Sequence, residues 1–103
     1  MKRITILGNL VEDVELKKAG GKTVANIRVA CEGKGGKDDV AFIPVTVWEK
    51  QAENLQKYCG TKGSKVYIEA DVDNNNYEDK DGKKQYGFRF TAISIEYVGT
   101  KKD

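Results

Sequence analysis

Apolar side chains recur along this chain mostly with a period of two. Residues 3–13, 22–32 and 40–50 alternate apolar with polar positions, which predicts three β-strands that each turn one face toward a core. The apolar positions in the inward phase are Ile4, Ile6, Ala25, Ile27, Val29, Ile43, Val45 and Val47. We therefore expect the amino-terminal half to form a sheet.

Glycine marks the connections between these strands. Gly20 and Gly21 lie between the first two strands and suit positive φ, so a hairpin turn is expected there. The second connection, residues 33–39 (GKGGKDD), has too much glycine and charge for a strand and is interpreted as a mobile loop.

The period changes after Trp48. Within residues 49–63, Ala52, Leu55 and Cys59 fall on one helical face, and the glycines at 60 and 63 provide a stop. One short helix is therefore predicted between the third and fourth strands.

Two further strands, joined by a D-G turn, are predicted after the helix. Residues 64–77 and 85–98 return to period two. The inward positions expected for them are Val66, Ile68, Ala70, Val72, Phe88, Phe90, Ile93, Ile95 and Tyr97. The phase slips between Phe90 and Ile93, which predicts a bulge or bend near residues 91–92.

Three strands, a helix and two strands are the order of a five-stranded Greek-key barrel of the OB type. The fold class expected is all-β with one short helix. A small SH3-like barrel or a split sandwich could share the strand count, although neither calls for a helix at that position. At 103 residues and 39% hydrophobic content, the chain is expected to be a single domain over residues 1–103.

The third strand carries aromatic rings on its outward face. Phe42 and Trp48 share that face with Pro44 and Thr46, and six residues place the rings roughly 20 Å apart at about 3.3 Å per residue. OB folds bind oligonucleotides or oligosaccharides over the second and third strands. Rings stack on unpaired bases, so the pattern favours a single strand as ligand. Alternatively, the rings pack against a second copy of the chain or a curled loop.

The net charge of +2 is too small to indicate a nucleic-acid partner by itself, so any basic footprint must be local. Six residues are the candidate phosphate contacts: Arg3, Arg28, Lys34, Lys37, Lys62 and Lys65.

Catalysis and metal chemistry find little support in the composition. The chain has no histidine, and Cys31 and Cys59 lie outside any C-x-x-C pattern, so buried thiols and no metal, cofactor or enzyme activity are expected. No apolar run approaches the about 20 residues of a membrane span, and the amino terminus lacks a secretory signal. A cytoplasmic protein with no membrane partner is expected.

Three motifs, in order, extend this interpretation. They are L-G-N-L followed by D-x-E-L, then W-x-K-x-A-E at the helix entrance, then K-G-S-x-V-Y-I-E leading to Y-E-D-x-D-G. With them, nearly the whole chain resembles the bacterial and phage single-stranded-DNA-binding proteins. The resemblance implies an OB fold that assembles as a homotetramer, less often a dimer, and protects single-stranded DNA in replication, recombination and repair.

Residue by residue, the resemblance implies stacking roles for Phe42, Trp48 and Tyr77. A further family aromatic would fall near Gly35, so one platform is expected to be missing. The basic stretch usual in the fourth strand is replaced by five carboxylates between residues 71 and 81. The chain ends at VGTKKD without the family's acidic tail, so recruitment of partners through a tail is not expected. The alternative function is an OB-fold protein-interaction subunit of the primosome-accessory type.

Overall fold

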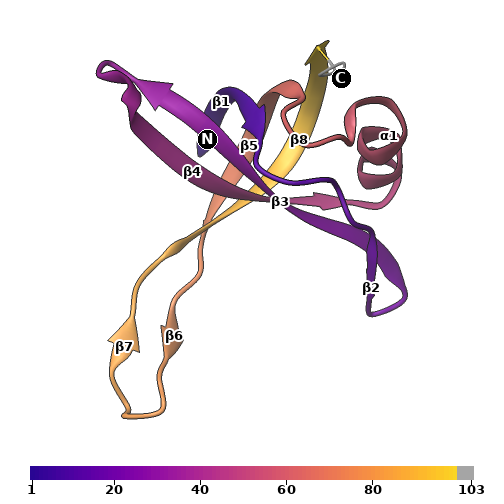
Figure 1. Cartoon of the computed structure of the whole chain (residues 1–103). Helices are drawn as coiled ribbons and strands as arrows, with labels where there is room; N and C mark the ends of the chain where they lie inside the picture. Colours follow the sequence, from indigo (N-terminus) through magenta and orange to yellow (C-terminus); the bar gives the residue numbers. More distant parts are fainter. Residues whose placement is uncertain (100–103) are drawn as a thin grey trace.

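A closed barrel of five strands forms the body of the computed structural model, which describes residues 1–99 (Figure 1). The barrel strands are β1 (Arg3–Leu10), β3 (Lys22–Gly33), β4 (Gly36–Trp48), β5 (Lys65–Asn74) and β8 (Phe88–Gly99). They are ordered β1-β5-β8-β4-β3, and a pairing of β1 with β3 closes the ring. The predicted five-stranded OB barrel is confirmed.

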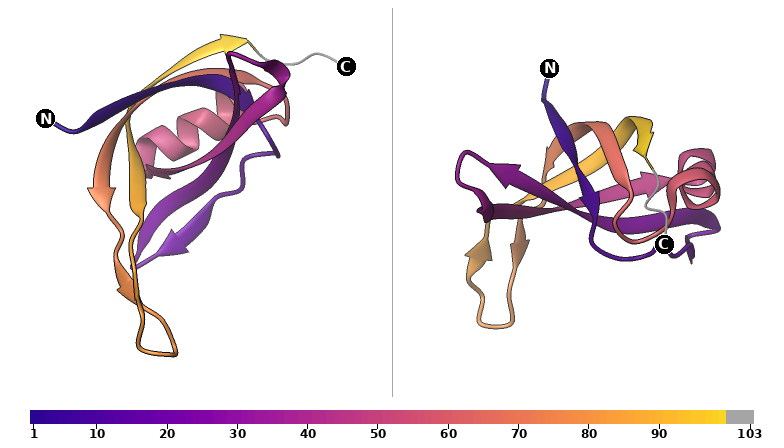
Figure 2. Two further views of the ribbon diagram at one scale, coloured as in Figure 1. Left: turned by 90° about the vertical axis from the view of Figure 1, so that its left-hand side faces the viewer. Right: turned by 45° about the horizontal axis from the view of Figure 1, so that its top comes forward.

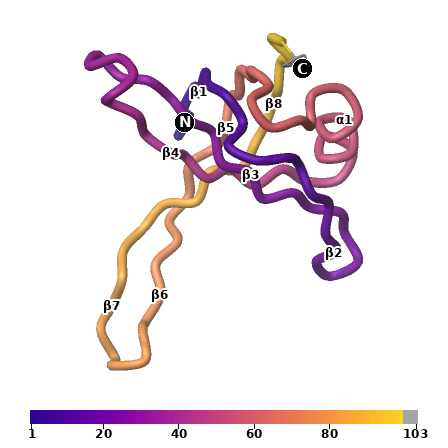
Figure 3. Tube along the Cα trace, in the orientation of Figure 1, coloured from indigo at the N-terminus to yellow at the C-terminus, as the bar shows by residue number. Residues whose placement is uncertain are grey.

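The remaining elements decorate this barrel. The helix α1 (Glu49–Cys59) follows β4, as predicted, and short strands β2 (Lys17–Ala19), β6 (Tyr77–Glu78) and β7 (Lys84–Gln85) lie in the connections. Two further views show the β6–β7 hairpin, which we call the arm, extending away from the barrel (Figure 2). In the tube view the arm and the β2–β3 hairpin are separate projections (Figure 3).

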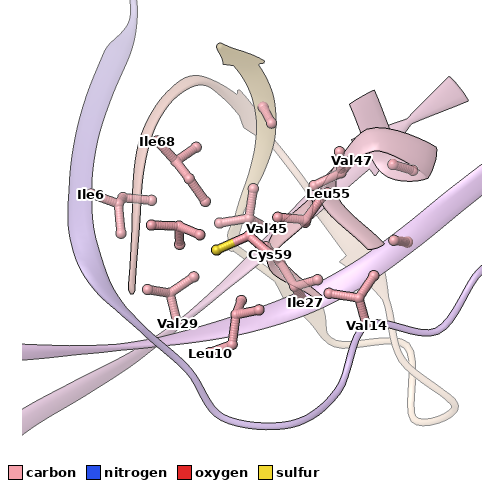
Figure 4. Packing of buried hydrophobic residues seen from close by; sticks show 14 of the residues in the cluster. Ile6, Leu10, Val14, Ile27, Val29, Val45, Val47, Leu55, Cys59 and Ile68 are labelled. Atoms are coloured by element: carbon pink, nitrogen blue, oxygen red, sulfur yellow. The ribbon is translucent and has the colours of Figure 1, made fainter. Parts of the chain in front are cut away.

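The core lies inside the barrel and under α1. Its side chains come from β1, β3, β4, β5 and α1 and converge on one another (Figure 4). Ala52, Leu55 and Cys59 are fully buried, so the predicted helical face is confirmed. Among the strands, alternate positions such as Ile27 and Val45 are buried at 4% and 2% exposure. The alternation therefore identified the inner faces of β3 and β4 correctly.

Closure of the barrel depends on a close approach of β1 to β3. Asn9 and Leu10 pair with Ala30 and Val29. A Cβ added to Gly8 would lie 2.3 Å from the backbone oxygen of Ala30, so only glycine fits where the strands meet.

The two glycine-rich connections differ from each other. Gly20 and Gly21 have φ of 58° and 81°, and the residues on either side pair, so the predicted hairpin is confirmed.

The loop predicted over 33–39 is wrong in its extent. Gly33 pairs with Gly36, whose φ of 71° turns the chain directly into β4. The Gly35 amide donates to Asp39 Oδ2 at 3.2 Å, which ties the rest of this segment back to the turn.

The predicted bulge in the last strand is present, one residue later than expected. Glu69 pairs with Ser94 and Ala70 with Ala92, so Ile93 is the extra residue of β8. Ala92 is buried in its place, and Ile93 is 39% exposed, which makes the inward prediction for Ile93 wrong.

Phe90 and Ile95 pack against the core as predicted. Phe88 and Tyr97, also predicted inward, lie near the two ends of β8 and are 65% and 42% exposed. Those two predictions are wrong because strand phase alone does not show where the barrel ends.

Candidate nucleic-acid interface

The outward phases of β3 and β4 form one continuous face, which we call the ring surface. Its paired positions are Val24 with Trp48, Asn26 with Thr46, Arg28 with Pro44 and Ala30 with Phe42. Paired residues of an antiparallel ladder point to the same side, so Phe42 and Trp48 lie on one face. Phe42 is 59% exposed and Trp48 37% exposed, while Val45 and Val47 on the opposite phase are buried.

Trp48 is the more sheltered ring because the chain folds around it. Glu49, the next residue, has a φ of 55°, and this left-handed residue bends β4 into α1. Lys22 of the β2–β3 hairpin lines a recess beside the ring, and Ala19 lines another. The hairpin thus flanks Trp48 and leaves part of the indole open, whereas Phe42 stands clear of it.

Tyr77 lies on the arm and is 60% exposed. The arm's turn is organised by Asp79. Its Oδ1 accepts hydrogen bonds from the amides of Asp81 and Lys83 at 3.0 and 2.9 Å, and its Oδ2 accepts one from Gln85 at 2.9 Å. These hydrogen bonds lower the pKa of the Asp79 carboxyl, and the bond from the Lys83 amide has the largest effect.

The carboxylates of this region are largely offset by nearby cations. The arm carries three acidic residues and three lysines: Glu78, Asp79, Asp81, Lys80, Lys83 and Lys84. At its base, Asp73 Oδ1 accepts from Lys2 Nζ at 2.8 Å, and this contact lowers the pKa of Asp73 and raises that of Lys2. The stretch is therefore less repulsive to phosphate than a count of its carboxylates indicates.

Three of the candidate phosphate contacts lie with the rings. Arg28 is central to the ring surface, where both its Nε and its Nη2 are 3.4 Å from Glu12 Oε1. Lys34 and Lys37 are exposed at the β3–β4 turn, beyond the Phe42 end of the same surface.

The other three candidates lie elsewhere. Arg3 is on the outer face of the β1–β5 pair and donates to Glu69 of β5. Lys65 pairs with Asn9 at the other end of β1, and the Lys62 amide donates to Asp13 at 2.7 Å. The structure does not bring these three residues to the rings.

Sequence reasoning missed two residues beside the ring surface. Arg89 and Phe88 of β8 line a recess together with Asn26 and Thr46 of the ring surface. The alternation of Phe88, Arg89 and Phe90 placed Arg89 outward, which was the available signal. The crossing of β8 next to β4 was not visible in the sequence.

The described residues indicate neither a metal site nor a membrane-spanning helix. Residues 1–99 contain no cluster of three or more histidine, cysteine or acidic side chains able to hold a metal ion. Both thiols are free there: Cys59 is buried, as expected, and burial raises the pKa of the half-buried Cys31. No helix within the same residues has the length and apolar character to cross a bilayer.

Comparisons with known proteins agree with this geometry. The model of the single-strand binding protein family matches residues 1–98. A single-stranded DNA-binding protein of Clostridium tetani is 34% identical over 95% of this chain and 70% of its own length. Single-stranded DNA-binding protein 1 of Clostridium acetobutylicum is 28% identical, with 100% of this chain and 98% of the relative covered.

A solved structure has the same fold. The crystal structure of a mitochondrial single-stranded DNA-binding protein of S. cerevisiae superposes with a TM-score of 0.83 and covers 97% of both chains at 22% identity.

Proposed function

This chain belongs to the single-strand binding protein family, and we propose that it binds single-stranded DNA without reading its sequence. The observation that carries the proposal is the ring surface, where Phe42 and Trp48 are both exposed on the outward face of β4, with Pro44 and Thr46 between them. Rings turned outward contribute less to folding than buried rings do, whereas unpaired bases stack on them. Members of this family protect single strands in replication, recombination and repair, and we propose the same role here.

Stacking supplies the proposed affinity. A base on an aromatic ring is worth about 1–3 kcal/mol and needs no particular base, because every base has a π-face. Bases in a duplex already stack on their neighbours and are closed to the rings. Phe42, Trp48 and Tyr77 are the proposed platforms, with Tyr77 reached where the strand passes from the barrel to the arm.

Phosphate contacts supply the remainder. Arg28, Lys34 and Lys37 share a surface with the rings and are the nearest candidates. Arg3, Lys62 and Lys65 would be reached only by a strand that wraps beyond the ring surface. Arg28 faces Glu12 at 3.4 Å, so a phosphate has to displace that carboxylate to bind it.

We further propose that the chain acts as a homotetramer, or less favourably a dimer. One barrel offers a short binding face, and continuous coverage of a strand requires several copies acting together. Light scattering of the free protein tests this assembly, and a monomer mass would contradict it.

The family consists of binding proteins, and we propose that this chain likewise has no catalytic activity and works in the cytoplasm. We propose that residues 1–103 act as one OB-fold domain. Assays for nuclease activity with and without magnesium test the first point.

The binding proposal is tested by titrating the protein with oligo-dT while recording tryptophan fluorescence. Trp48 is the only tryptophan, so every change in signal reports on the ring surface. We expect strong quenching by oligo-dT and little by a duplex of equal length. An unchanged indole signal at saturating oligo-dT would indicate instead an OB-fold subunit that binds protein.

A further inference from the structure

The barrel has a weakly paired seam between β4 and β8. Within residues 1–99, these two strands share one register pair, Thr46 with Thr91. Pro44 precedes that pair and has no N–H to offer a ladder, so it suits an edge that lacks a partner. Beside Pro44 the seam widens into a recess of about 180 Å³.

The walls of this recess combine apolar and polar groups. Ile27, Val45 and Phe90, all of the inward phase, line it together with Asn26 and Asn75, which carry amide groups. An apolar lining with a few polar groups around it is typical of small-ligand sites. The size and polarity suit a planar ring that needs hydrogen-bond partners at its edge.

Phe88 and Arg89 complete the wall on the β8 side. Phe88 is 65% exposed although a phenylalanine at a strand position is ordinarily covered. Arg89 is also exposed, and its Nη2 donates to Asn75 Oδ1 at 3.0 Å, which fixes the guanidinium at the recess. Further donors of the guanidinium are available, because arginine carries five N–H groups.

The positive charge of Arg89 is available to a ligand. Its partner across the ladder is Asp73, whose carboxylate would otherwise neutralise it. Asp73 also forms an ion pair with the ammonium of Lys2 at 2.8 Å, and Asp71 acts on the same pair. Lys2 therefore shares the charge of Asp73, and the guanidinium of Arg89 keeps N–H groups for a phosphate.

The seam is continuous with the ring surface. A second recess, of about 420 Å³, lies beside the first and is lined by Trp48. Asn26, Thr46 and Arg89 line both recesses, so Arg89 stands between Trp48 and Phe88. A strand stacked on Trp48 would reach the seam with its next nucleotides.

We propose that the β4–β8 seam holds one nucleotide of the bound strand, with its base stacked on Phe88 and an adjoining phosphate bound by Arg89. This inference rests on the proposed single-stranded DNA binding and adds a subsite to it. Phe88 then adds one stacking platform at the seam.

The test measures oligo-dT binding by Trp48 quenching in four variants and the wild type. Loss of the ring in Phe88→Leu is expected to weaken binding on the order of 5- to 150-fold, and Phe88→Tyr, which keeps a ring, to bind within about twofold of wild type. Arg89→Gln should weaken binding and lower the slope of log affinity against log salt by about 0.7, the value for one phosphate on a single strand. A purely structural role for Arg89 would leave that slope unchanged.

The fourth variant, Lys57→Gln, is the matched charge control, because Lys57 lies on α1 over the Tyr58 ring and outside both recesses. Its binding should equal that of wild type. If Phe88→Leu or Arg89→Gln binds oligo-dT as tightly as the wild type does, the subsite is overturned and the proposed function stays intact. Failure of the wild type to bind oligo-dT would overturn both. Phe88, Arg89 and Lys57 are all exposed, so thermal unfolding is expected to show all four variants folded.

Discussion

Removal of the Phe42 ring separates binding from folding. The side chain is 59% exposed, so only about two-fifths of it is buried. Full burial of a phenylalanine contributes about 1.5–3 kcal/mol, and Phe42→Ala should therefore cost about 1 kcal/mol of folding free energy. The ring's stacking contribution of about 1–3 kcal/mol is lost entirely from binding, which is a fall in affinity on the order of 5- to 150-fold.

Ile68 of β5 provides the opposite control. It is fully buried and lines neither recess, so Ile68→Ala should cost about 2–5 kcal/mol of folding free energy and, while the protein stays folded, leave affinity close to that of wild type. Urea denaturation gives the folding terms, and titration with oligo-dT followed by Trp48 fluorescence gives the binding terms. Wild-type affinity in Phe42→Ala, or a variant that fails to fold, would refute the assignment of Phe42 to an exposed stacking face.

Three further perturbations test the fold around the site. Gly8→Ala should lose about 1–3 kcal/mol in urea denaturation, because the new Cβ meets the Ala30 oxygen; an unchanged midpoint would contradict the β1–β3 closure. Ser64→Ala should gain about 1–3 kcal/mol, since the buried Ser64 hydroxyl has no hydrogen-bond partner among residues 1–99; a loss would show that the hydroxyl is bonded. The pKa of Asp79 is lowered on folding, so its support of the arm is present above the ordinary aspartate pKa and is lost as pH falls through the lowered value. Amide exchange at Lys83, measured by NMR, should therefore accelerate in acid relative to the barrel amides, and an unaltered ratio would refute the role of Asp79.

The inner and outer faces of β3 and β4 were predictable because the residue types of the two faces alternate regularly along each strand. Along β4, small and branched apolar residues alternate with Phe42, Pro44, Thr46 and Trp48, and the structure keeps that phase throughout. A period of two is a local property, so a local pattern suffices to identify it. The exposure of the rings followed from the same argument.

Features that depend on where strands meet were not predictable. Alternation placed Ile93 inward, but a bulge that matches β8 to β5 gives that place to Ala92. The glycines of the β3–β4 connection allowed a tight turn as readily as a loop, and pairing of Gly33 with Gly36 decided between them. Arg89 became a candidate only when the crossing of β8 beside β4 brought it to the ring surface.

The most direct test of the account is a map of the DNA on the protein. Side-chain and backbone NMR signals can be followed while oligo-dT is added, with a duplex of equal length as the comparison. The account predicts that the largest shifts occur at Phe42, Trp48 and Tyr77, that signals of Tyr58 on α1 stay in place, and that the duplex produces little change. Shifts that cluster around Tyr58, or equal shifts with duplex and single strand, would contradict binding of unpaired bases on the ring surface.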